Sequence, residues 1–186
     1  GGAEVLLTNQ ADVIASADKL VLPGVGAFGD CLRGLRDAHL IGIVKELAHS
    51  RPLLGICVGM QMLFDSSEEM GLHDGLGLLP GRVVGFDFVR HLDANRALRV
   101  PHTGWNRLQP LRDSPLLDGM PDSSYAYFNH SYYCIPDDPD DVVAYTDHGE
   151  DFASVVSRGQ MYGIQCHPEK SQEVGLHILR NFVEQG

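Results

Sequence analysis

The chain has 186 residues, of which 44% are hydrophobic, so it is long enough for one well-buried domain and short for two. Its 14 basic and 25 acidic residues give a formal net charge of −11, which disfavours a nucleic-acid backbone as the main partner. No apolar stretch reaches the roughly 18 to 20 residues that a membrane span needs. We therefore expect a single domain over residues 1–186, without a nucleic-acid or membrane partner.

The cysteines indicate a reduced, cytoplasmic protein. Four of them lie at irregular spacing and match neither a disulfide framework nor a zinc ribbon: Cys31, Cys57, Cys134 and Cys166. We expect no metal and no cofactor. Because the chain starts with Gly1-Gly2-Ala3 and no methionine, the absence of a signal peptide carries little weight.

The first half of the chain predicts strands that alternate with helices. Short apolar runs predict strands at Glu4–Thr8, Lys19–Leu22 and Pro52–Ile56. Apolar residues at three- and four-residue spacing over 30–49 predict an amphipathic helix that is broken once near Gly42. A further helix is predicted at Gly59–Asp65. This alternation favours an α/β fold with a mainly parallel sheet and helices on both faces.

The second half is rich in β-strand signals. Runs of β-forming residues, separated by Gly, Pro and Asp, predict strands at Arg82–Phe88, Arg99–Leu108, Ser124–Cys134, Val142–Asp147, Phe152–Ser157 and Gln160–Gln165. A closing helix is predicted at Glu173–Glu184. We expect the strands to be antiparallel additions to the parallel sheet.

Cys57 is the first candidate for chemistry. It lies between Gly55 and Gly59, directly after a predicted strand, as the nucleophile does in a sharp strand-to-helix elbow. The positive end of the next helix and a nearby imidazole would lower the thiol pKa from about 8.5 toward neutrality. A buried and inert core cysteine is the alternative interpretation.

The second candidate is the pair His167 and Glu169. They follow a predicted alternating strand, and an acid two residues after the histidine can orient the ring as the base for a thiol nucleophile. A plain surface turn would contain the same residues. Cys166 is a rival nucleophile, but strand alternation directs it to the opposite face from His167, so we expect it in the core.

Three other runs are candidates for binding. Pro23–Gly29 matches G-x-G-x-x-G, but no acidic residue ends a strand about 20 residues on, as a dinucleotide site requires. Its backbone N–H groups suit an oxyanion, although a tight turn needs the same glycines. Pro101–Asn106 holds the sole tryptophan, which fits either a core or a partner-facing surface. Tyr127–Tyr133 groups polar donors that suit a small polar substrate or a hydrogen-bonded turn.

Together, G-x-C-x-G-x-Q at Gly55–Gln61 and His-Pro-Glu at His167–Glu169 resemble the class I (triad) glutamine amidotransferases. Further runs are similar to the glutaminase subunits of imidazole glycerol phosphate synthase in histidine biosynthesis: Pro23–Gly26, Pro101–Asn106, Asn129–Tyr133 and His167–Gln172. The resemblance covers nearly the whole chain in the expected order. It implies a flavodoxin-like fold, in which the family places one more strand and a helix before Glu4–Thr8. We therefore expect a domain without that first strand and helix, with apolar surface uncovered beside the Cys57 strand.

The resemblance also implies roles for individual residues. Cys57 would be the nucleophile, His167 the general base and acid, and Glu169 its orienter. The oxyanion would be held by Val58, Val25 and Gly26. Glutamine-binding positions would be Gly26, Gln61, His130, Ser131 and Tyr132. Positions against the partner would be Pro101, His102, Trp105, Tyr127 and Lys170.

The implied reaction begins when the thiolate attacks the side-chain amide of glutamine and forms a γ-glutamyl thioester and ammonia. The ammonia would pass to a (β/α)₈-barrel cyclase partner, which makes imidazole glycerol phosphate and aminoimidazole carboxamide ribotide. Two alternatives stay open. The chain could be another amidotransferase of this class, which feeds anthranilate, aminodeoxychorismate or purine synthesis, or a non-catalytic interaction domain with the same fold. The runs Pro101–Asn106 and His167–Gln172 argue against the first, and an intact Cys57, His167 and Glu169 set argues against the second.

Overall fold

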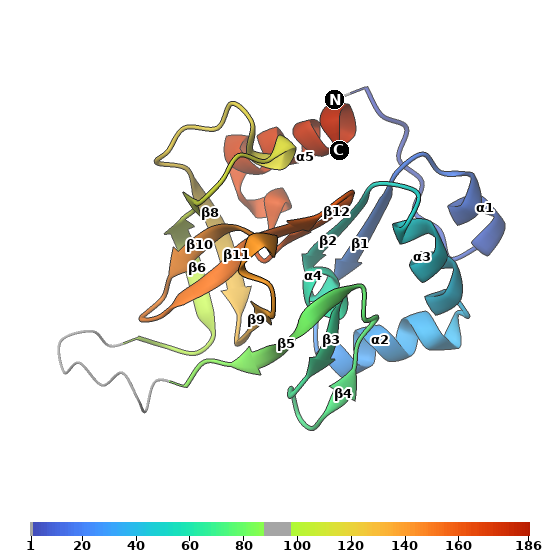
Figure 1. Ribbon diagram of the computed structural model, residues 1–186, viewed down its shortest axis with the longest axis horizontal. Coiled ribbons are helices and arrows are strands. Elements are labelled where there is room, and N and C mark those ends of the chain that lie inside the picture. Colours follow the sequence, from blue (N-terminus) through green and yellow to red (C-terminus); the bar gives the residue numbers. More distant parts are fainter. Residues whose placement is uncertain (1, 88–97) are drawn as a thin grey trace.

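The computed structural model describes residues 2–87 and 98–186, and its elements are labelled in Figure 1. The helices are α1 (Ala11–Ser16), α2 (Phe28–Asp37), α3 (Ile41–Ala48), α4 (Val58–Met62) and α5 (Gln172–Gln185), with 3₁₀ turns η2 (Pro115–Leu117), η3 (Pro139–Asp141) and η4 (Pro168–Lys170). The strands of the first half are β1 (Leu20–Gly24), β2 (Leu53–Cys57), β3 (Phe64–Ser67), β4 (His73–Asp74) and β5 (Leu79–Gly85). Those of the second half are β6 (His102–Arg107), β7 (Gln109–Pro110), β8 (Tyr125–His130), β9 (Tyr132–Pro136), β10 (Val142–Asp147), β11 (Asp151–Arg158) and β12 (Met161–Ile164).

One large mixed sheet organises the molecule. Its strands follow the order β1-β2-β12-β11-β9-β5-β3-β4, and β10 and β7 extend it beside β11. Strands β1, β2 and β12 are parallel, whereas β11, β9 and β5 continue the sheet in antiparallel pairs. Strands β6 and β8 form a separate antiparallel pair. The predicted α/β fold, with a parallel block and appended antiparallel strands, is confirmed.

Neighbouring residues of β2 face opposite layers of core. Leu53 lies in an apolar cluster with Phe28 and Leu32 of α2, and Leu54 lies in a second cluster with Phe182 of α5. This alternation is what a strand buried on both faces requires. Helices therefore cover both faces of the parallel strands, as predicted (Figure 1).

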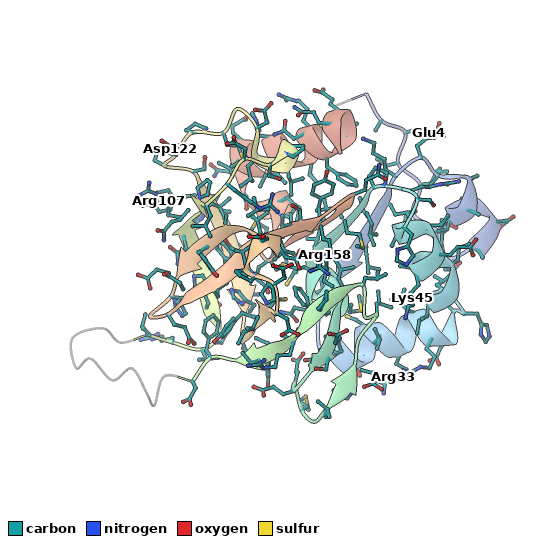
Figure 2. All side chains as sticks on the ribbon, viewed as in Figure 1. Glu4, Arg33, Lys45, Arg107, Asp122 and Arg158 are labelled. Carbon is teal, nitrogen blue, oxygen red and sulfur yellow. The ribbon has the colours of Figure 1, made fainter. Side chains whose placement is uncertain are left out.

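The predicted strand at Glu4–Thr8 is wrong. These residues have no regular structure, and the side chains of Val5, Leu6 and Leu7 are 86%, 65% and 97% exposed. A strand needs a neighbour that accepts and donates its backbone hydrogen bonds. Within residues 2–87 and 98–186, β1 pairs only with β2 and no strand pairs with this segment. Figure 2 shows Glu4 on the same side of the molecule as α1, far from Arg107 at the end of β6.

Other element boundaries also differ from the predictions. The predicted helix over 30–49 is two helices, α2 and α3, and the break falls at residues 38–40, where His39 has a positive φ of 58°. Helix α4 ends at Met62, and the chain enters β3 because Phe64 pairs with Leu79 of β5. The predicted strand at Ser124–Cys134 is interrupted at Ser131 and forms β8 and β9. Strand β5 ends at Gly85, and Phe88 of the predicted Arg82–Phe88 strand lies outside the described residues.

Residues 2–87 and 98–186 contain neither a candidate membrane span nor a candidate metal-binding cluster. No helix there combines the length and apolarity that crossing a bilayer requires. Those same ranges contain no group of three or more His, Cys, Asp or Glu side chains that could hold a metal ion.

Candidate active site

The turn between β2 and α4 places Cys57 in a strained conformation. Cys57 has φ 54° and ψ −113°, a region that residues other than glycine rarely occupy. The flanking glycines allow this turn to pack tightly. A Cβ on Gly59 would lie 1.8 Å from the Leu22 carbonyl oxygen of β1, and a Cβ on Gly55 would lie 2.7 Å from the Met60 backbone. The expected strand-to-helix elbow is therefore present.

The Cys57 thiol is buried and receives hydrogen bonds. Its residue is 4% exposed, and Gln165 Nε2 donates to Sγ at 3.6 Å. Burial raises the thiol pKa to about 11, although the hydrogen bond from the Val58 backbone lowers it. The thiol pKa is therefore not lowered toward neutrality here, because desolvation outweighs the hydrogen bonds from Val58, the first residue of α4, and from Gln165. A neutral thiol needs a base before it can act as a nucleophile.

His167 and Glu169 lie at the end of the strand next to β2. Strands β2 and β12 are parallel, with Ile56 opposite Ile164, so their carboxyl ends share one edge of the sheet. His167 Nδ1 and Glu169 Oε1 are 2.9 Å apart. Because an ionised carboxylate only accepts, Nδ1 donates and the other ring nitrogen of a neutral imidazole stays free to take a proton. The Glu169 charge also contributes to the raised Cys57 pKa, so the carboxylate acts on the sulfur.

The backbone of His167 is held firmly. Its N–H donates to the Tyr127 carbonyl at 2.8 Å, and its carbonyl accepts from Ser171 Oγ at 2.7 Å. Ser171 Oγ in turn accepts from the Tyr127 N–H at 2.9 Å. Strand β8 is thereby joined directly to the segment that carries the histidine.

The expected oxyanion loop approaches the start of α4. A Cβ on Gly24 would lie 2.7 Å from the Gly59 nitrogen, so loop and helix meet backbone to backbone. Gly26 has a φ of 103°, which favours glycine, and the Val25 side chain is 83% exposed. The Val25 carbonyl accepts from Cys31 Sγ at 3.5 Å. Gly24, which precedes Val25 and Gly26, therefore packs against Val58 and Gly59 at the start of α4.

Three of the predicted glutamine-binding residues, Gln61, His130 and Tyr132, are joined by hydrogen bonds, and Gln61 is 2% exposed. Gln61 Nε2 donates to the Tyr132 carbonyl at 3.0 Å and to Gln165 Oε1 at 3.1 Å. His130 Nδ1 lies 2.8 Å from the same Tyr132 carbonyl. Ser131 lies between β8 and β9, and its carbonyl accepts from the Phe86 N–H at 3.2 Å.

Gln165 is the residue that sequence reasoning missed. It is fully buried and contacts both Gln61 and the Cys57 sulfur. The available signal was its position two residues before His167, which places both side chains on one face of an alternating segment. Cys166, one position further, is fully buried in the second core cluster, as predicted.

Most of the predicted partner-facing residues gather on β6, β8 and η4. Trp105 is 48% exposed, and its ring meets that of Tyr127 at a centroid distance of 6.2 Å. Lys170 Nζ lies 5.5 Å from the centroid of the Tyr127 ring. Pro101 is exposed just before β6. His102 differs from these four, because it is 4% exposed and faces inward.

Comparisons with known proteins agree on the family. The model of the glutamine amidotransferase class-I family matches residues 5–185. The chain belongs to the class-I glutamine amidotransferase family. This class-I amidotransferase is 48% identical over 185 residues to the imidazole glycerol phosphate synthase subunit HisH of Salinibacter ruber, over 98% of this chain and 84% of that protein. It is 46% identical to the HisH subunit of Sulfurimonas denitrificans, over 98% of this chain and 87% of that protein.

Solved structures show the same fold. A crystal structure of a glutamine amidotransferase matches this class-I amidotransferase with a TM-score of 0.71 and 18% identity, over 98% of this chain and 88% of that chain. A glutamine amidotransferase of Thermotoga maritima matches with a TM-score of 0.59 and 19% identity, over 91% and 62% of the two chains. The expected family is confirmed, and the HisH relatives favour the imidazole glycerol phosphate synthase branch over both alternatives.

Proposed function

We propose that the protein is the glutaminase subunit of imidazole glycerol phosphate synthase, which hydrolyses glutamine and passes the ammonia to a cyclase. The juxtaposition of Cys57 with the His167 and Glu169 pair carries this proposal. The cysteine occupies a strained turn at the end of β2, and the hydrogen-bonded pair follows the adjacent parallel strand β12. Acyl transfer from an amide requires a thiol nucleophile and an oriented imidazole base, and the ends of β2 and β12 supply one of each.

In the first half of the reaction, His167 takes the thiol proton as the Cys57 sulfur attacks the side-chain carbonyl carbon of glutamine. The carbonyl oxygen becomes an oxyanion, which the Val58 N–H and a peptide N–H of the Val25-Gly26 loop would stabilise. The C–N bond then breaks. His167 returns the proton to the leaving nitrogen, which departs as ammonia and leaves a γ-glutamyl thioester.

In the second half, His167 takes a proton from water as the water oxygen attacks the thioester carbon. The C–S bond breaks, glutamate leaves and the thiol regains its proton. Glu169 holds the imidazole in one orientation during both halves. Gln61, His130, Ser131, Tyr132 and Gly26 would surround the bound glutamine.

The partner of this subunit would be a (β/α)₈-barrel cyclase in a heterodimer. The exposed residues Pro101, Trp105 and Lys170 and the half-buried Tyr127 would lie against it, and His102 would lie beneath that face. Passage of ammonia within a complex keeps it from being protonated in bulk water. All four cysteines are free, which suits the reducing cytoplasm.

The test is the substitution Cys57→Ala, measured in the complex with the cyclase. We expect glutamine-dependent synthesis of imidazole glycerol phosphate to stop, and synthesis from added ammonium to continue. Cys31→Ser is the matched control, since it removes the half-buried thiol but keeps a donor for the Val25 carbonyl, and this variant should keep the glutamine-dependent activity. Glutamine-dependent turnover by Cys57→Ala would show that the nucleophile is another residue.

A further inference from the structure

Two buried histidines outside the proposed chemistry contact each other. His102 of β6 and His130 of β8 are opposite one another in the antiparallel register, and they are 4% and 6% exposed. His102 Nδ1 lies 3.0 Å from His130 Nε2. One nitrogen must donate and the other accept, so the tautomers of the two rings depend on each other.

Asn106, which contacts His102 on the side away from His130, has donor and acceptor atoms whose positions are fixed. Asn106 Oδ1 accepts from the Arg107 N–H at 2.8 Å, and Asn106 Nδ2 donates to the Asp147 carbonyl at 2.8 Å. Both backbone groups have only one possible role, so they fix the orientation of the amide. Asn106 Nδ2 also lies 3.1 Å from His102 Nε2, which must therefore accept. A neutral His102 then carries its proton on Nδ1 and donates to His130.

The Tyr132 carbonyl, which contacts His130, also requires that His102 donate to His130. His130 Nδ1 lies 2.8 Å from the Tyr132 carbonyl, which can only accept, so this nitrogen carries the proton. Neutral His130 is then an acceptor at Nε2, which is the role that His102 needs. Burial lowers the pKa of His102 to about 4 and that of His130 to about 3, so both rings are neutral near pH 7. The two ends agree on one set of tautomers.

The chain of hydrogen bonds continues to the candidate nucleophile. The Tyr132 carbonyl also accepts from Gln61 Nε2, and the second N–H of that amide points to Gln165 Oε1. With its oxygen so engaged, Gln165 presents Nε2 to the Cys57 sulfur. An unbroken set of donors and acceptors thus joins Asn106, at the half-exposed edge of β6, to Cys57.

We propose that Asn106, His102 and His130 are positioning residues, which fix the Tyr132 carbonyl and through Gln61 and Gln165 keep an N–H donor on the Cys57 sulfur. This inference rests on the proposed glutaminase function for its consequence, although the tautomers themselves do not depend on it. A donor at sulfur stabilises the thiolate, whereas a reversed Gln165 amide would face it with an oxygen. The Tyr132 carbonyl accepts from Gln61 in any case, so Asn106 acts on the thiol only through how firmly His102 and His130 hold that carbonyl in place.

The direct test reads the tautomers. In ¹⁵N-histidine-labelled protein at pH 7.5, long-range ¹H–¹⁵N spectra should show His102 and His130 with the proton on Nδ1 and a bare Nε2. Signals are assigned with the single variants His102→Gln and His130→Asn. A proton on Nε2 of either ring in the unaltered protein would overturn the proposal.

The functional test removes the outer end of the chain. Asn106→Ala leaves His102 Nε2 without its donor, but the Tyr132 carbonyl still requires the proton on His130 Nδ1, so both tautomers should persist. Because the His102 ring is then held less firmly, we expect alkylation of Cys57 by iodoacetamide to be slower by roughly tenfold at pH 7.5. The apparent pKa of Cys57, obtained from the pH dependence of the alkylation rate, should be higher in Asn106→Ala than in the unaltered protein. In the complex with the cyclase, kcat for glutamine hydrolysis should fall more than KM rises. Asn129→Ala is the matched control, because Asn129 is an exposed asparagine of β8 on the opposite face from His130, and its Oδ1 accepts from Thr103 Oγ1 at 3.1 Å. It should change neither tautomers nor alkylation.

A double-variant cycle separates positioning from loss of structure. His130→Asn keeps a side-chain N–H donor near the Tyr132 carbonyl but removes the acceptor for His102. In that background, Asn106→Ala should have no further effect on Cys57 alkylation. If Asn106→Ala slowed alkylation equally in the unaltered protein and in His130→Asn, the proposal that Asn106 acts through His130 would be overturned. If Cys57→Ala retains glutamine turnover, the proposed function fails while the tautomer result still stands, so the two failures are distinguishable.

Discussion

Two short apolar segments of similar composition differ in this protein, since one forms a buried strand and the other is exposed without regular structure. Strand β2, Leu53–Cys57, has parallel neighbours on both sides, and its two leucines are at most 1% exposed. The segment Glu4–Thr8 has no regular structure, and its two leucines are 65% and 97% exposed. The difference teaches that apolar composition makes a strand only where the fold supplies neighbours for the backbone and cover for both faces.

The same difference explains where the candidate chemistry lies. A strand held on both edges can end in a strained turn, because the surrounding structure compensates for the strain. Cys57 has such support from β1, β12 and α4, whose backbones approach it closely. A reactive residue in the segment 4–8 would have no comparable support.

The largest expected effect comes from Gly59→Ala, which disrupts the close packing of β1 against the turn between β2 and α4. The added Cβ would lie 1.8 Å from the Leu22 carbonyl oxygen, so backbone must move. We expect the free energy of unfolding to fall by more than about 4 kcal/mol, measured by urea denaturation. Gly34→Ala is the control, since its Cβ meets nothing within 4 Å on helix α2 and should leave stability unchanged or slightly higher. Equal stability of both variants would contradict the close packing of β1 and α4.

The next effect compares the two segments directly. Leu54→Ala removes a fully buried side chain of β2 and should cost about 2 to 5 kcal/mol of unfolding free energy. Leu7→Ala removes a side chain that is 97% exposed and should change stability by less than about 0.5 kcal/mol. Urea denaturation of both variants beside the unaltered protein measures the difference. A cost for Leu7→Ala close to that of Leu54→Ala would show that the segment 4–8 is packed in solution.

A third prediction concerns how the stability of the protein depends on pH through the buried histidines His102 and His130. Burial holds the pKa of His102 at about 4 and of His130 at about 3, below the value of 6.5 for a free histidine. The charges of nearby histidines, His148 for both and His167 for His130, act in the same direction. Below pH 6.5 the unfolded chain therefore binds more protons than the folded one, and acid destabilises the fold.

As the pH falls below 6.5, each of these histidines should lower the free energy of unfolding with a slope that approaches about 1.4 kcal/mol per pH unit near pH 5. Well above pH 6.5 their contribution is constant. Urea denaturation at pH 7.5, 6 and 5 measures the slope, and His130→Asn should show a smaller one. Stability that is independent of pH in this window for the unaltered protein would mean that the pair is not buried in the neutral form.

The smallest effect concerns backbone exchange. Amide hydrogens of β2 bond to β1 and β12, so we expect them to exchange only through global unfolding of the protein. Those of residues 4–8 should exchange at nearly the rate of an unstructured chain. Hydrogen exchange followed by mass spectrometry on peptides covering the two segments distinguishes them, and protection of residues 4–8 would remove the contrast.

The sequence alone determined the features that depend on neighbours along the chain. The glycines around Cys57 predicted a sharp turn because only glycine lets two backbones approach so closely there. The spacing of His167 and Glu169 predicted their hydrogen bond, and alternation predicted the burial of Cys166. The order of strands and helices predicted an α/β sheet with antiparallel additions.

Only the tertiary structure decided the features that depend on distant partners. The pKa of Cys57 is set by burial under elements far away in sequence, which no local motif reveals. Gln165 and the His102 and His130 pair acquire their roles from strands that meet in space. The segment Glu4–Thr8 has the composition of a strand but lacks a neighbour. Hydrogen bonding and desolvation depend on what surrounds a group, and that surrounding exists only once the chain has folded.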